Sequence, residues 1–114
     1  MTADRMRRVD EAVREVLSDA ISLQVKDPRI GFVTVTAVET APDLRRARVF
    51  VSVLGEQGAR KRSLEGLRSA HGILQAAVAR ELRLKHTPAL EFVYDDTSER
   101  GMRIAELIDR EAGE

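Results

Sequence analysis

The residues best suited to bind a phosphate chain lie in the middle of this 114-residue sequence. Residues 45–86 carry ten basic side chains against three acidic ones, whereas residues 89–114 carry three against eight. The net charge of the whole chain is +0. The uneven distribution of charge along the chain, and not the net charge, therefore favours an anionic partner. The alternative is that these charges only solvate the faces of helices.

The sequence Ala70-His71-Gly72 lies inside this basic segment, between two stretches with helical periodicity. Glycine has no Cβ, so it tolerates strained backbone and the close approach of a second backbone. A kink at this point would direct the N–H groups of the following helix toward a phosphate chain. We therefore expect either tight backbone contact or a positive φ at Gly72, the alternative being an ordinary glycine at a helix end.

RNA binding requires cations for the phosphates and stacking or edge contacts for the bases. The candidate RNA contacts are Arg60, Lys61, Arg62, Arg68, Ala70, His71, Gly72, Arg80, Arg83, Arg45, Arg46 and Arg8. The alternative for Arg60, Lys61 and Arg62 is that they only solvate the start of a helix. The alternative for Arg80 and Arg83 is pairing with Glu81 or exposure to solvent. Phe50 offers a ring for stacking, although we expect it to pack under the helices.

Other kinds of chemistry have no support in the sequence. Cysteine is absent, which excludes disulfides, thiolate nucleophiles and cysteine-based zinc sites and fits a reducing compartment. His71 and His86 have no ligand partner at metal spacing, and helix capping explains the acids at 95–99. Because no signal peptide or membrane span is apparent, we predict a cytoplasmic protein. Because no catalytic or ligand pattern is apparent, we also predict that it has no catalytic residues, metal, cofactor or small-molecule substrate.

The apolar pattern predicts one domain over residues 1–114, with frayed ends at 1–4 and 112–114. The predicted elements are helix 5–25, strands 32–38 and 47–53, helices 60–69 and 73–82, strand 90–94 and helix 99–111. The turn at Ala41-Pro42-Asp43-Leu44 is short enough to make the first two strands an antiparallel pair. A three-stranded sheet needs cover on one face, so the fold class is α+β, with the helices packed as a layer on one face.

The order αββααβα, with a special turn between the central helices, is that of a type II KH domain. Over nearly its whole length the chain resembles the bacterial ribosome-binding factor A family. The matching stretches are Arg8-Val9, Asp27-Pro28-Arg29-Ile30, Val33-Thr34-Val35-Thr36, Asp43-Leu44, Ala47-x-Val49-x-Val51-Ser52, Ala70-x-Gly72, Leu82-x-Leu84, Pro88, Leu90-x-Phe92, Asp95-x-Thr97 and Gly101-Met102-Arg103-Ile104. Their joint order and spacing carry the resemblance.

This resemblance implies a KH-like fold in which Ala-x-Gly replaces the usual Gly-x-x-Gly clamp. It also implies a monomeric ribosome assembly factor that binds the small (30S) subunit or its precursor, near the neck and the 3′ region of 16S rRNA. The implied role is late maturation and processing of that rRNA, especially in the cold. The alternative function is a protein–protein adaptor that uses its helical face without direct RNA contact.

Overall fold

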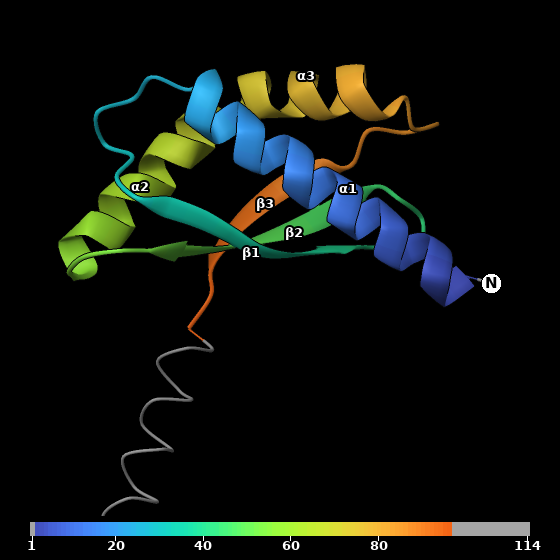
Figure 1. Ribbon diagram of the computed structural model, residues 1–114, viewed down its shortest axis with the longest axis horizontal. Coiled ribbons are helices and arrows are strands. Elements are labelled where there is room, and N and C mark those ends of the chain that lie inside the picture. Colours follow the sequence, from blue (N-terminus) through green and yellow to red (C-terminus); the bar gives the residue numbers. More distant parts are fainter. Residues whose placement is uncertain (1, 97–114) are drawn as a thin grey trace, which may run out of the picture.

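The computed structural model describes residues 2–96. The described elements are α1 (Thr2–Leu23), β1 (Val33–Thr40), β2 (Arg46–Val53), α2 (Gln57–Ser69), α3 (His71–Leu82) and β3 (Ala89–Tyr94) (Figure 1). The strands form one sheet in the order β1-β2-β3, with β1 antiparallel and β3 parallel to β2. The predicted α+β architecture is confirmed, while the helix predicted over 99–111 lies outside the described residues. Helix α1 begins at Thr2, within the range predicted to be frayed.

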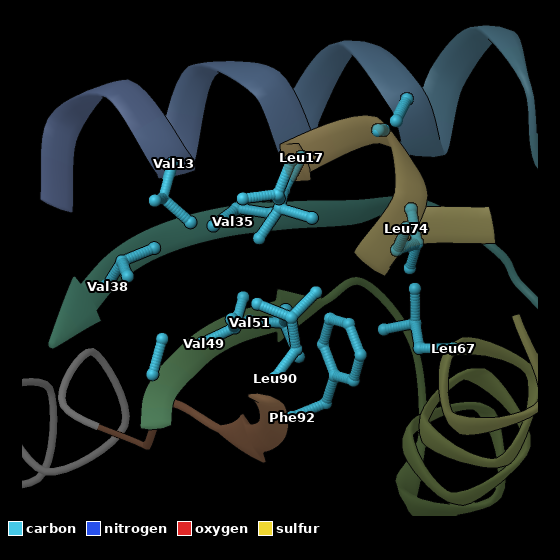
Figure 2. Close-up of a cluster of buried hydrophobic side chains, with 14 of the residues drawn as sticks. Val13, Leu17, Val35, Val38, Val49, Val51, Leu67, Leu74, Leu90 and Phe92 are labelled. Atoms are coloured by element: carbon cyan, nitrogen blue, oxygen red, sulfur yellow. The ribbon is translucent and has the colours of Figure 1, made fainter. Parts of the chain in front are cut away.

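All three described helices lie on the same face of the sheet (Figure 1). Helix α1 packs against β1 and α3, and α2 packs against β3. The residues buried between the layers are Val13, Leu17, Ala20, Val35, Val38, Ala47, Val49, Val51, Leu67, Ala70, Leu74, Ala77, Val78, Leu90 and Phe92 (Figure 2). The predicted amphipathic pattern of the first helix is thus confirmed by Val13, Leu17 and Ala20, which all face this core.

Phe50 lies on the other face of the sheet. Its neighbours Val49 and Val51 are fully buried against the helices, and successive strand residues point to opposite faces. Phe50 is only half-buried and lines a hollow with Ala37 and Val93. The expectation that Phe50 packs under the helices was wrong, and the reason is the simple alternation of the strand.

A β-bulge at Thr36 changes the phase of β1. Val35 pairs with Val51 and Ala37 pairs with Phe50, so Thr36 is an extra residue on β1. Its hydroxyl donates to Asp95 Oδ2 at 2.6 Å and lies 3.2 Å from Phe50 O. The bulge therefore buries Val35 and Val38, three positions apart, where a regular strand would bury every second residue.

Helix α2 is fastened to the loop that follows α1. Ser63 is 1% exposed, and its hydroxyl accepts a hydrogen bond from Gly31 N at 3.2 Å. At Gly66, a Cβ atom would lie 2.6 Å from Ile30 Cγ1, so only glycine lets the helix approach this closely. Within the loop, hydrogen bonds from the Arg29 side chain and backbone lower the pKa of the Asp27 carboxyl.

Gly66 and Gly72 provide a matched pair of substitutions. Gly66→Ala should lower the free energy of unfolding by about 1–3 kcal/mol, because the added methyl group overlaps Ile30. Gly72→Ala should be neutral or stabilising by up to about 1 kcal/mol, because nothing lies within 4 Å and alanine favours the helix. Thermal and urea unfolding of both variants measures the difference. Equal midpoints would show that Gly66 is not a point of close helix–loop contact.

Candidate nucleic-acid interface

The predicted junction between the central helices is present. Helix α2 ends at Ser69 and α3 begins at His71, and the two run in different directions (Figure 1). Ala70 joins them with φ −86° and ψ 8°, and its methyl group is buried in the core. Ala70 therefore positions the junction and has no exposed side chain to offer RNA.

Gly72 does not have the geometry expected from the sequence. It lies inside the first turn of α3, is exposed, and has neither a positive φ nor any atom within 4 Å of an added Cβ. The expectation of strained or tightly packed backbone was wrong, because the chain turns at Ala70 with φ and ψ that any residue adopts. Gly72 leaves open space beside the N-terminus of α3. Ala70, the residue that caps this terminus, has no side chain that could accept a hydrogen bond from the helix N–H groups.

The predicted cations do not form one patch. Arg60, Lys61 and Arg62 lie in the first turns of α2, whereas Arg80 and Arg83 lie at the end of α3, on the opposite side of the domain (Figure 1). Leu84, the neighbour of Arg83, lies near the β1–β2 turn, which ends at Arg45 and is followed by Arg46 of β2. A groove lined by Arg5, Met6, Val9, Pro42, Leu44 and Leu84 joins the first turns of α1, where Arg8 lies, to this turn and to the segment after α3.

Arg60 is engaged within the fold. Its guanidinium carbon lies 4.0 Å from the centre of the Tyr94 ring, and the residue is half-buried. A cation over an aromatic face contributes about 0.5–1 kcal/mol at such a site. Sequence reasoning offered only phosphate contact or solvation for Arg60 and missed this contact, whereas Lys61 and Arg62 are exposed as expected for either alternative.

Arg68 also has a structural partner. Its Nη2 atom donates to Phe92 O at 3.3 Å, on the edge of β3 that does not face β2. Gln75 of α3 completes the same edge, since its side chain donates to Pro88 O at 2.6 Å and accepts from Leu90 N at 3.3 Å. Arg68 and Gln75 thus fasten α2 and α3 to β3. Gln75 was missed because no periodicity marks a polar residue that caps a strand edge.

The basic residues at the end of α3 are exposed. Arg80 Nε lies 3.6 Å from Glu81 Oε1, which is the pairing that the sequence suggested as an alternative to RNA contact. Arg83 caps α3 in the left-handed region with φ 46° and ψ 41°. A residue with a Cβ is strained in this conformation, and glycine is the usual residue at such a cap. Helix capping alone therefore does not explain why position 83 is an arginine.

The sheet face away from the helices was not recognised in the sequence as a distinct surface. Arg48 lies in register between Glu39 of β1 and Glu91 of β3. This cross-strand row balances the charge of Arg48, so the centre of the face is less basic than the sequence of β2 suggests. Arg46 lies in register with Ala89 and has no acid opposite it on β3.

The described part of the chain offers little to other kinds of site. Residues 2–96 hold no group of three or more His, Asp or Glu side chains that could bind a metal ion. No helix in this range is both long and apolar enough to cross a bilayer. His71, inside the junction, is half-buried.

Comparison with known proteins agrees with this architecture. The family model for ribosome-binding factor A matches residues 5–108. The chain belongs to the ribosome-binding factor A family. A relative from Halothermothrix orenii is 45% identical over 108 residues, covering 95% of this chain and 88% of that protein. A relative from Anaeromyxobacter sp. strain Fw109-5 is 48% identical over 108 residues, covering 94% of this chain and 88% of its own length.

Solved structures of the family share the fold. The crystal structure of the Thermus thermophilus factor has a TM-score of 0.70 and 29% identity, covering 78% of this chain and 94% of that one. A solution structure from Thermotoga maritima has a TM-score of 0.73 and 35% identity, covering 80% and 87%. A model of the T. thermophilus factor, fitted into a cryo-electron microscopy map of its 30S complex, has a TM-score of 0.63 and 32% identity, covering 77% and 92%.

Arg83 allows the contact role to be separated from the fold. Arg83→Gly should raise the free energy of unfolding by about 1 kcal/mol, because glycine removes the left-handed strain at φ 46°. If Arg83 contacts a phosphate, the same variant should bind 30S subunits more weakly despite its greater stability. Unfolding curves and co-sedimentation with subunits measure the two effects. Unchanged affinity in the stabilised variant would remove Arg83 from the interface.

Proposed function

We propose that this protein is a non-catalytic ribosome assembly factor that binds the 30S subunit or its precursor through 16S rRNA. It acts as a monomer in the cytoplasm, near the neck of the subunit and the 3′ region of the rRNA, and favours late maturation and processing, most strongly in the cold. The observation that carries the proposal is the likeness of this chain, over 77% of its length, to a family member fitted into a 30S complex. The KH-like order of elements supports an RNA partner.

The distribution of exposed charge supports contact along the α2–α3 helix pair. Lys61 and Arg62 at its start and Arg83 at its end are all exposed, and the open junction at Gly72 lies between them. A phosphate chain that follows the pair meets cations at both ends and helix N–H groups at the bend. We therefore propose two cationic contact regions joined by the junction, in place of one compact basic patch.

The first test uses the salt dependence of binding. Replacing both Lys61 and Arg62 by Ala should reduce the slope of log affinity against log salt for 30S binding by about 0.7 for each lost phosphate contact. Both side chains are exposed, so the unfolding midpoint should stay nearly the same. Titration of purified 30S subunits at several salt concentrations measures the slope.

The matched control is Lys26→Ala, which removes an exposed cation outside the basic segment and should leave the slope unchanged. Arg60 is excluded from the double variant because loss of its contact with Tyr94 would lower stability and confuse the result. A double variant with the parental slope would contradict contact by these two residues and would favour an apolar protein–protein interface, the adaptor alternative.

The second test concerns the assembly role. A factor that only binds acts by stabilising one state of the precursor over its alternatives, so its loss shifts populations and stops no reaction. A deletion strain should accumulate unprocessed 16S rRNA and free subunits, with the largest effect in the cold. Ribosome profiles and analysis of rRNA ends at several temperatures measure this.

Complementation of the same strain tests for catalysis. Asp96→Asn should restore growth as well as the parent gene, because we assign no acid–base role to the acids that follow β3. A deletion profile identical to the parental one at every temperature would contradict the assembly role. Failure of Asp96→Asn, with normal folding and normal subunit binding, would instead support a catalytic function.

A further inference from the structure

Two large apolar side chains are exposed next to each other at one end of the β1–β2 pair. Phe32 is 81% exposed and Leu54 is 76% exposed. Leu54 N donates to Phe32 O at 3.1 Å, which continues the antiparallel pairing one step beyond Val33 and Val53. Of the aromatic residues in the described range, Phe92 is buried and Phe50 and Tyr94 are half-buried, so Phe32 is the one that is mostly exposed.

The start of α2 lies beside this pair. Gly31, which precedes Phe32, donates through its N–H to Ser63 Oγ at 3.2 Å. Gly55, which follows Leu54, would carry its Cβ 3.1 Å from Ala59 Cβ. The residues that flank Phe32 and Leu54 therefore both contact the turn of α2 from Ala59 to Ser63, which includes Lys61 and Arg62.

The turn of α2 that Gly31 and Gly55 contact carries two exposed cations. Arg62 is exposed, and its guanidinium extends along the start of α2 to within 3.1 Å of a Cβ built on Gly58. Lys61 is exposed in the same turn, and Glu56 is the acidic residue at the start of this helix. We call Phe32, Leu54, Lys61 and Arg62 the Phe32 corner.

The composition of the Phe32 corner fits single-stranded RNA better than a protein partner. An exposed ring beside cations is the usual combination for unpaired bases, since the ring stacks on the base and the cations meet the phosphates. Two apolar side chains are far fewer than the roughly 20–30 residues that each partner contributes to a stable protein interface. Charge complementarity also favours a polyanion over an apolar protein surface.

We propose that Phe32 is a stacking platform for an unpaired base of single-stranded RNA whose phosphates pass Arg62 and Lys61, with Leu54 packed against the base or its sugar. This inference rests on the proposed RNA-binding function and adds a base contact at the end of the β1–β2 pair that lies next to the start of α2. It gives the protein a contact whose strength depends on a base and not only on phosphate charge.

Substitutions at Phe32 test the stacking. Phe32→Ala should weaken binding to purified 30S subunits by about fivefold or more, with an unchanged salt slope, because stacking involves no charge. Phe32→Trp should keep the parental affinity, and Phe32→Leu, which has similar apolar bulk without a ring, should be as weak as Phe32→Ala. Leu23→Ala is the control, since Leu23 is 76% exposed at the end of α1 and lines a hollow with Ala77 and Glu81 of α3. Unfolding midpoints of all four variants should stay close to the parental value.

Photo-crosslinking identifies the partner. With p-benzoylphenylalanine in place of Phe32, irradiation in the presence of 30S subunits should yield a product that ribonuclease digests. A Phe32→Leu variant with full affinity would overturn the stacking proposal, as would a crosslink only to a ribosomal protein or parental affinity in Phe32→Ala. A parental protein that fails to bind 30S subunits at all would be a different result and would refute the proposed function itself.

Discussion

The central strand β2 is the constraint on which the rest of the described structure depends. It is bonded to β1 on one edge and to β3 on the other, and one of its faces carries Ala47, Val49, Val51 and Val53, all 5% exposed or less. That apolar row can leave water only if a layer covers it, and the three helices form that layer. Because the helices cover one face, the other face, with Arg46 and Phe50, stays open.

The attachment of the helices to the edges of the sheet determines where charge reaches the surface. Ser63 and Gly66 hold α2 against the loop after α1, while Arg68 and Gln75 hold the helix pair against the outer edge of β3. These contacts place the start of α2 and the end of α3 on opposite sides of the domain. A segment that is predominantly basic in sequence is therefore divided into two regions, and the region at the start of α2 contacts Gly31, the residue before the exposed Phe32.

Sequence reasoning predicted the elements well because their signals are local. The alternation of apolar and polar residues in β2 and the helical spacing of Val13, Leu17 and Ala20 depend on nothing distant. The Pro42 turn is equally local, since Leu44 N donates to Ala41 O at 2.8 Å and closes it. Sequence reasoning missed contacts where a distant partner decided the outcome: Arg60 stacks on Tyr94, thirty-four positions later in the chain. Gly66 and not Gly72 is the glycine in close contact, because the neighbour that requires it is Ile30.

The sequence by itself determined the fold class, the order of the described elements and the family, since each follows from local periodicity or from motifs in a specific order. Tertiary structure alone decided how the cations divide, which glycine is sterically required and which aromatic ring is exposed. A strand register and a bulge such as that at Thr36 set which face a side chain occupies, and both depend on pairing with residues far along the chain. Exposure of Phe32 follows from the same cause. Phe32 lies just beyond Val33 and Val53, the pair that ends the β1–β2 ladder, a position that no local pattern identifies.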